Sequence, residues 1–280
     1  MRLPPPGYSR RVLGPGWSEV VALLAAYLIA VLATPAGVSG AVLLLPFQIT
    51  VLGTPSPAVT PTNLLYNVVA VPGALYRYWR QGQRGGRLSL LLIAGTVPGV
   101  VAGSVIRVEL LPGPEVFSLV VAAVLIPLGA WIACTRPSAG SESGGPSGRP
   151  RPLFPAPVLI ALAGAVGCVG GIYGIGGGSI LAPMLIAEGS PPAEVAPAAL
   201  ASTFVTSIAG VITFTILSIH QHSAIAPAWP TGLALGVGGL AGAYTGARIQ
   251  SRLPDLLIRR VLGVLVVAIG ARYLWTGLVA

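Results

Sequence analysis

The sequence predicts an all-α polytopic membrane protein made of two inverted-topology repeats, with about eight to ten hydrophobic helical segments that include short broken or re-entrant helices. Three observations support this fold class. The chain has 280 residues, of which 54% are hydrophobic and 8% are charged, whereas soluble domains carry roughly 25% charged residues. Most of its apolar segments have the length of about 17–25 residues that a helix needs to cross a bilayer. The two halves of the chain also repeat one pattern of glycines and prolines.

Two of the apolar segments, 40–52 and 176–187, are too short to cross a bilayer, and each follows a glycine-rich break. A polar stretch rich in Ser, Gly and Pro divides the chain nearly in half, as a flexible linker would. We expect an N-terminal tail, a first transmembrane repeat, a cytoplasmic linker and a second transmembrane repeat, over 1–16, 17–134, 135–152 and 153–280. The apolar segments are 17–34, 40–52, 59–79, 88–106, 115–133, 153–171, 176–187, 195–219, 231–247 and 256–279.

The two halves share three blocks in the same order. A glycine-rich break with a short apolar segment comes first, a proline-flanked start of a span comes second, and three glycines spaced four residues apart come third. Each half thus holds a span, a glycine break, a short helix and three more spans. The matching residues are Gly37, Gly40 and Pro46 with Gly174, Gly177 and Pro183; Val59 and Pro61 with Val195 and Pro197; and Gly95, Gly99 and Gly103 with Gly238, Gly242 and Gly246.

The basic residues predict how the repeats are oriented. All 16 are Arg, and they fall in short loops between apolar runs, which the positive-inside rule explains better than nucleic-acid binding does. The loop after segment 59–79 carries four Arg and is expected inside, whereas its counterpart, 218–230, carries none and is expected outside.

The next pair of loops shows the opposite bias. In the loop 107–115, Arg107 is offset by Glu109 and Glu115, so this loop is expected outside, whereas its counterpart carries four Arg and is expected inside. Equivalent loops on opposite faces define an inverted repeat, and this scheme puts the linker 135–152 inside. It also puts the N-terminus outside, although the tail carries three Arg.

Six glycines lie in the stretch 170–183, "GGIYGIGGGSILAP", within one of the most apolar parts of the chain. Helix breaks at membrane depth are tolerated where the freed backbone is buried in protein or lines a cavity. Short Gly-interrupted segments at matching positions of two inverted halves indicate a transporter's binding site. Because the short helices begin just after their glycines, their N-termini present N–H groups and the positive end of the helix dipole, which attract anions. We therefore expect an anion cradle built from main chain.

Two nucleotide-binding interpretations of these glycines fail. The stretch is not a dinucleotide loop because no soluble β-α-β pattern surrounds it, and it is not a P-loop because it lacks Gly-Lys. Tight helix packing through small-xxx-small motifs is the remaining alternative. We favour packing for the stripes 95–103 and 238–246, and a binding site for the breaks 37–40 and 174–178, since short helices follow those breaks.

Polar side chains lie in the span after each short helix. Asn63 and Asn67 are four residues apart and share one helix face; polar residues inside a membrane usually face a cavity or another helix. Their equivalents are Ala199 and Thr203, so the second half offers hydroxyls where the first offers amides. Interhelical hydrogen bonding is the alternative role for all of them. The candidate binding residues are Gly37, Gly40, Asn63, Asn67, Gly174, Gly176, Gly177, Gly178, Ser179 and Thr203.

The segment "GGIYGIGGGSILAPML", its weaker copy "TPAGVSGAVLLLPF" and the stretch "SPAVTPTNLLYNVVAVPGALYRYWR" resemble the signature of the TauE/SafE family of sulfite and organosulfur anion transporters. The similarity covers nearly the whole chain. It implies a secondary transporter of small anions such as sulfite, sulfonates or other organosulfur or carboxylate anions in the bacterial cytoplasmic membrane. Because a negative-inside potential drives anions outward, we expect export.

The expected partners are a small anion and membrane lipid, with a homodimer left open and no nucleic acid. No cofactor or metal is expected, since His220 and His222 have no Cys or acidic partner nearby in the sequence. Two alternatives to transport stay open. One is a non-transporting membrane assembly subunit. The other is an intramembrane hydrolase, which needs a base beside Ser179 or Cys168, whereas both His lie in one distant loop.

Overall fold

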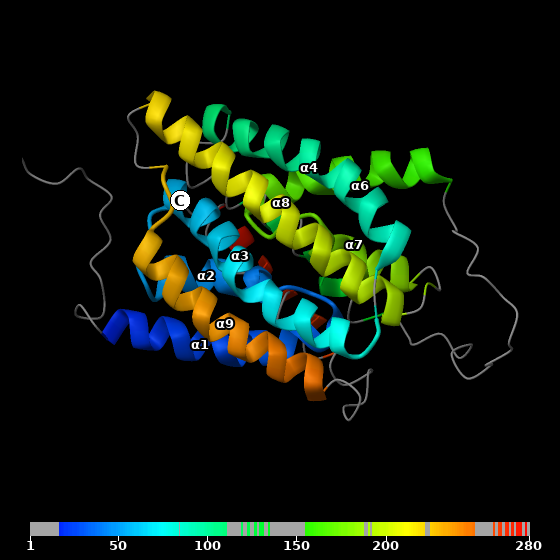
Figure 1. The fold of residues 1–280 in the computed structure, drawn as a ribbon. Coiled ribbons are helices and arrows are strands. Elements are labelled where there is room, and N and C mark those ends of the chain that lie inside the picture. The colour runs from blue at the N-terminus through cyan, green and yellow to red at the C-terminus, as the bar shows by residue number, and fades with distance from the viewer. Residues whose placement is uncertain are drawn as a thin grey trace, which may run out of the picture.

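The computed structural model describes residues 17–110 except 84, 155–187, 190, 192–221 and 225–249, with scattered residues between 119 and 134 and between 260 and 278. Every regular element in this part of the chain is a helix, which confirms the all-α class (Figure 1). The expected tail, 1–16, and linker, 135–152, lie outside the described residues. The elements, labelled as in Figure 1, are α1 (Trp17–Ala33), the 3-10 turn η1 (Thr34–Ala36), α2 (Ala41–Thr50), α3 (Ser56–Arg80), α4 (Gly86–Glu109), α6 (Ala156–Tyr173), α7 (Gly178–Ala187), α8 (Pro192–Gln221) and α9 (Trp229–Ile249).

Three stretches of described helix are long and apolar enough to cross a membrane: α4, α6 and Glu194–His220 of α8. The surface of α1 also fits lipid as the solvent. Leu24 and Leu28 are more than half exposed, whereas the alanines on the opposite face are buried. Large apolar side chains outside and small ones at the helix contact are typical of membrane helices. The chain is therefore a polytopic membrane protein.

Two helices are broken where the glycine pattern predicts it. After α1, Gly37 caps η1 with a φ of 71°, and α2 then begins at Ala41. After α6, Gly174 caps the helix with a φ of 82°, and α7 begins at Gly178. Both caps have the left-handed conformation that glycine adopts without a Cβ penalty. The two short helices have 10 residues each, so the expectation of short helices after glycine breaks is confirmed.

Each stripe of three glycines brings two helix backbones into direct contact. A Cβ added to any of these glycines would overlap or crowd a carbonyl oxygen of the neighbouring helix. The contacts are Gly95–Ile160, Gly99–Gly164 and Gly103–Cys168 between α4 and α6, and Gly238–Leu23, Gly242–Tyr27 and Gly246–Val31 between α9 and α1. In both stripes, each step of four residues along the glycine helix corresponds to a step of four residues in the same direction along its partner. Each pair of helices is therefore parallel and in fixed register. The packing interpretation of the stripes is confirmed.

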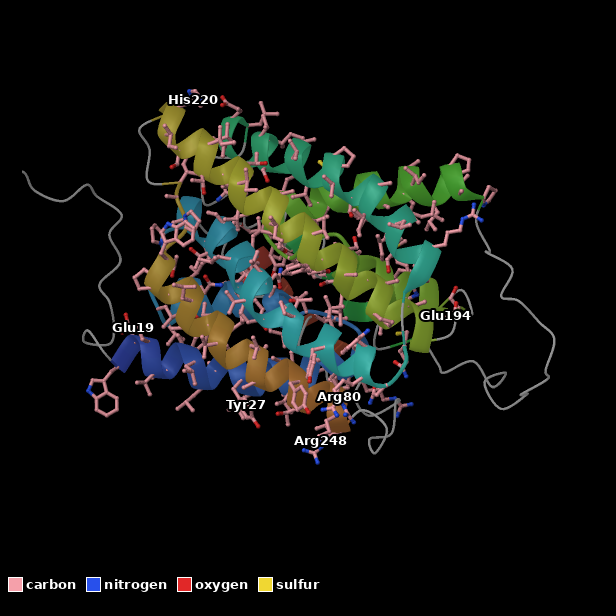
Figure 2. All side chains as sticks on the ribbon, in the orientation of Figure 1. Glu19, Tyr27, Arg80, Glu194, His220 and Arg248 are labelled. Carbon is pink, nitrogen blue, oxygen red and sulfur yellow. The ribbon has the colours of Figure 1, made fainter. Side chains whose placement is uncertain are left out.

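The directions of the helices agree with two halves of opposite orientation. Figure 1 shows that α1 and α6 run in opposite directions, as do α3 and α8, and α4 and α9. Figure 2 shows Arg80 and Arg248, from the two loops expected inside, near one end of the bundle, whereas Glu19 and His220 lie at the opposite end. The inverted repeat itself, and the side of the membrane that each end faces, stay predictions.

Arg107 corrects the loop predicted over 107–115. The structure places Arg107 in the last turn of α4, where the side chain is 2% exposed. The predicted apolar segment stopped at the first charge, but α4 continues through it to Glu109 because the packed face of the helix continues too. Glu115 lies outside the described residues. The assignment of this loop to the outside, which was based on its charges, therefore rests on fewer exposed charges than the sequence suggested.

Replacing Gly99 by Ala tests the packing of α4 on α6. Because its Cβ would overlap the Gly164 carbonyl oxygen, Gly99→Ala is expected to lower stability by about 1–3 kcal/mol. Thermal unfolding in detergent, followed by size-exclusion chromatography of the remaining folded protein, measures the loss. Gly164→Ala is the matched control in the same interface, since its Cβ would meet nothing nearer than 3.6 Å. Equal losses in both variants would contradict the packing role.

Two glutamines test the orientation of the repeats: the exposed Gln81 directly after α3, and Gln221 at the end of α8. With Cys134 and Cys168 replaced by Ser, Gln81→Cys reports on the loop expected inside and Gln221→Cys on the loop expected outside. A membrane-impermeant maleimide added to intact cells should label Gln221→Cys and should reach Gln81→Cys after permeabilisation alone. Labelling of both cysteines in intact cells is incompatible with inverted halves, and the reverse pattern overturns the assigned sides.

Candidate functional site

The two breaks meet in the interior of the protein. The amide N of Ser39, just before α2, donates to Ser179 Oγ in the first turn of α7 at 3.2 Å. Ser39 Oγ in turn accepts a hydrogen bond from the Ala41 amide, also at 3.2 Å. The residues 37–46 and 173–183 are all buried. The breaks therefore contact each other directly and are closed to solvent in this conformation.

Asn67 joins the two breaks from the middle of α3. Its Oδ1 accepts a hydrogen bond from Ser39 Oγ, and its Nδ2 donates to the Ile175 carbonyl oxygen at 3.2 Å. Its side chain is fully buried. One amide side chain thus satisfies polar groups that both broken helices leave open, as burial at membrane depth requires.

Asn63 holds the start of α2 one turn earlier on the same face of α3. Its Nδ2 donates to the Ala41 carbonyl oxygen at 2.9 Å, and its Oδ1 accepts from Gln48 Nε2 at 3.0 Å. The Oδ1 and the Nδ2 of Asn63 therefore both form hydrogen bonds with other residues of the protein. Gln48, which follows Pro46 in α2, was not among the predicted site residues.

Two further side chains connect the halves across the breaks. Pro46 has no N–H and so leaves the carbonyl of Val42 without its helical partner; the Tyr173 hydroxyl of the other half donates to this oxygen at 2.9 Å. Thr60 Oγ1 donates to the Ile172 carbonyl oxygen at 3.3 Å in the last turn of α6. The backbone groups that the breaks expose are thus satisfied in part by side chains from the opposite half.

The second half differs because two of its buried hydroxyls have no hydrogen-bond partner among the described residues. Thr203 Oγ1 and Ser207 Oγ on α8 are buried and have no hydrogen-bond partner within the described part of the chain. A Cβ on Gly178 would lie 2.6 Å from Thr203 Oγ1, and one on Gly176 would lie 3.3 Å from Ser207 Oγ. Two unpaired hydroxyls therefore face the N-terminus of α7, where the amides of Gly178 and Ser179 precede the first turn's bonds from Ile180 and Leu181 to the Gly177 carbonyl.

Glycine is required along this edge for close approach. A Cβ on Gly178 would overlap the Ala199 carbonyl oxygen, and one on Gly177 would lie 2.6 Å from Thr96 Cγ2. Gly176 has a φ of 71°, a conformation in which a side chain is strained. The segment 176–178 therefore presents main chain, without side chains, toward α8 and α4.

The structure divides the predicted binding residues into two groups. Asn63 and Asn67 hydrogen-bond to protein, which is the alternative role considered for them, and Gly40 serves as the N-cap of α2 beside the Tyr66 hydroxyl. Gly176 and Gly178 lie beside the unpaired hydroxyls, one of which belongs to Thr203, and Gly177 lies between these glycines in the chain and faces Thr96. Gly37, Gly174 and Ser179 shape the two breaks. Their binding roles stay predictions. Ser207 joins the second group, and its spacing of four residues from Thr203 was the signal for it.

The arrangement offers hydrogen-bond donors and no negative charge. Among the described residues, every buried polar side chain is a hydroxyl, an amide or Arg107, and none is a carboxylate. Nor do three His, Cys, Asp or Glu side chains of these residues come together in a group that could hold a metal. Such a site has no carboxylate that would repel an anion, and it has no charged oxygen ligand for a cation.

Comparisons with known proteins agree with the membrane architecture. A model of the sulfite exporter TauE/SafE family matches residues 22–273. The probable membrane transporter protein YunE of Bacillus subtilis (strain 168) is 29% identical over 126 residues, which are 45% of this chain and 44% of that protein. The match thus spans less than half the length of this relative. No solved structure matches.

Removing the side-chain polar group of a hydrogen-bonded residue, Asn67, and of an unpaired one, Thr203, should have different effects on stability. Asn67→Leu leaves buried groups of Ser39 and Ile175 without their partner, so a loss of about 1–3 kcal/mol is expected. Thr203→Val removes a hydroxyl that has no protein partner and should leave stability unchanged or raise it. Thermal unfolding of both variants in detergent measures this difference. A clear loss of stability in Thr203→Val would show that its hydroxyl serves the fold.

Proposed function

The chain belongs to the TauE/SafE sulfite exporter family, and we propose that it is a secondary transporter that moves small anions, such as sulfite, sulfonates or other organosulfur or carboxylate anions, out of the cell. The anion binds where the two breaks meet, at the N-terminus of α7. The observation that carries this proposal is the pair of unpaired, buried hydroxyls, Thr203 and Ser207, beside a helix start that is made of glycine.

Donors of this kind select for negative charge. An anion at the start of α7 gains hydrogen bonds from first-turn amides and lies at the positive end of the helix dipole. Hydroxyls of Thr203 and Ser207 can rotate to donate, and bonds to a charged acceptor are stronger than bonds between neutral groups. The glycines let an oxyanion approach the main chain without a Cβ in the way.

Export follows from the membrane potential. A negative interior favours outward movement of an anion by about 2.3 kcal/mol per charge at 100 mV. The spans carry no described buried carboxylate that would relay protons. Movement driven by potential therefore needs nothing beyond the groups already described. Because the breaks are closed to solvent, an anion enters after part of one half moves relative to the other, as in other transporters with inverted repeats.

The two alternatives are less well supported. An intramembrane hydrolase needs a base beside its nucleophile. Ser179 Oγ instead accepts the Ser39 amide and donates to the Ile175 carbonyl at 3.4 Å, and His220 lies at the far end of α8 (Figure 2). An assembly subunit without transport would give no reason for two buried hydroxyls to lack partners, since such groups cost stability.

Flux in proteoliposomes tests the proposal. Vesicles that contain the purified protein should move labelled sulfite or sulfoacetate faster than empty vesicles, and faster still with a potential that draws anions across. Thr203→Val should reduce the flux about tenfold, because a hydrogen bond to a charged group is lost. Thr213→Val is the matched control on the same helix, since that hydroxyl donates to the Ala209 carbonyl within α8.

Two results would contradict the proposal. If the wild-type protein moves no member of an anion panel under any potential, the transport function is wrong. If the wild type transports and Thr203→Val does so at the same rate and half-saturating concentration, transport stands, but the anion does not bind at the start of α7.

A further inference from the structure

Arg107 is unusual because it is charged and buried in the membrane-spanning part of the fold. Its side chain is 2% exposed, and it is the largest of the fully or nearly fully buried side chains within the described residues. A position in the last turn of α4 would let a long side chain extend to the water interface, as Arg commonly does near helix ends. Here it stays inside. Charged residues buried in membrane spans usually mark a pathway for ions or substrate.

The glycine stripe of α4 shows how deep Arg107 lies. Gly103 contacts Cys168 of α6, and the two helices are parallel and in register. One step of four residues further along both helices brings Arg107 level with Ile172, two residues before the left-handed Gly174. Arg107 is therefore at the same depth as the start of the second break.

The face of α4 that carries Arg107 is also the face that contacts the candidate site. Thr96 lies three helical turns before Arg107 on this face, and its hydroxyl is 2.8 Å from Ser202 Oγ of α8. Between them, Val100 contacts the backbone of Gly171 and faces Gly210 of α8. Arg107 thus continues the α4 surface that packs against α6 and α8, where Thr203 and Ser207 lie.

One turn before Arg107, a further hydroxyl is left without a partner. Ser104 Oγ is fully buried and forms no hydrogen bond with the described residues. The Ser104 amide N is 3.1 Å from the position of a Cβ on Gly171, three residues before the break. With Thr203 and Ser207, it makes a third unpaired hydroxyl around the second break.

A structural role for Arg107 at the end of α6 explains less. A cation near a helix C-terminus stabilises the free carbonyls, but two of the last four carbonyls of α6 already have other partners. The Gly170 carbonyl accepts from the amides of Gly174 and Ile175, and the Ile172 carbonyl accepts from Thr60. Arg107 takes part in an interaction with its surroundings, so its charge is not isolated, and the Gly170 and Ile172 carbonyls are satisfied by other groups.

We propose that Arg107 is the fixed positive charge of the anion pathway, which raises the affinity for anions and excludes cations as the substrate passes between the second break and the end of α4. This inference rests on the proposed function. Arg stays protonated in a protein interior, so the charge is permanent. At about 10 Å and an effective dielectric of about 20, one unit charge changes anion binding about tenfold.

Charge removal and chemical restoration at this position test the proposal. In a Cys134→Ser, Cys168→Ser background reconstituted in proteoliposomes, Arg107→Cys should raise the half-saturating concentration of labelled sulfite or sulfoacetate about tenfold. Reaction with 2-aminoethyl methanethiosulfonate, which adds an ammonium, should restore it, whereas the 2-sulfonatoethyl reagent, which adds a negative charge, should lower the flux further. Arg107→Lys should keep the wild-type value. Arg248→Cys, an exposed Arg near the other end of the bundle, is the matched control and should change nothing.

The possible failures can be told apart. Wild-type transport with normal affinity in Arg107→Cys overturns the role of Arg107 and leaves the proposed function standing. Absence of transport by the wild type overturns both. A cysteine at 107 that reacts with neither reagent in transporting vesicles lies off the pathway. Loss of folding in Arg107→Cys that Arg107→Lys prevents assigns the charge to the fold, and also overturns the proposal.

Discussion

The structure depends on satisfying the backbone polar groups that two broken helices expose inside a membrane. No water is available there, and an unsatisfied group costs several kcal/mol. The protein meets this need with side chains that cross between halves. Asn67 hydrogen-bonds to both breaks, and Tyr173 donates to the carbonyl that Pro46 leaves open in α2. Neither half could hold its own break without the other, so the break and the contact between halves are one feature.

Both halves contain a left-handed glycine followed by a short helix, but different side chains surround these breaks, and this difference points to the candidate site. In the first half, Asn63 and Asn67 supply both donors and acceptors, and the Oδ1 and Nδ2 atoms of both side chains form hydrogen bonds. In the second half, Thr203 stands where Asn67 stands in the first, and its hydroxyl is unpaired. A threonine is too short to satisfy both breaks, so donors remain. Asn63 and Asn67 of the first half therefore stabilise the breaks, whereas Thr203 and Ser207 of the second half are the unpaired groups that we propose for a ligand.

Much of this could be predicted from residue patterns, and the rest depends on contacts that patterns do not contain. Glycines at equal spacing predicted the breaks and the packing stripes because glycine acts through the backbone, and backbone demands are local. Whether Asn67 faces a ligand or another helix depends on Ser39 and Ile175, which lie far from it in sequence. Arg107 was assigned to a loop because its neighbours are charged. Yet it follows Gly103 by the four residues at which the stripe repeats, and this spacing was a signal that the helix and its packed face continue.

The same contacts indicate where the closed protein can open. The glycine stripes bring carbonyl oxygens of one helix against the backbone of the next in α4–α6 and α1–α9, and separating those pairs would expose backbone along three turns. The direct bond between the breaks is longer: the Ser39 amide donates to Ser179 Oγ at 3.2 Å, and Ser179 Oγ donates within its own break to the Ile175 carbonyl oxygen at 3.4 Å. An anion that supplies acceptors for the Ser39 amide and the α7 amides would replace these bonds rather than simply break them. In the transporter that we propose, opening at the breaks with both stripe pairs intact would therefore cost less when an anion is bound, and this would couple movement to binding.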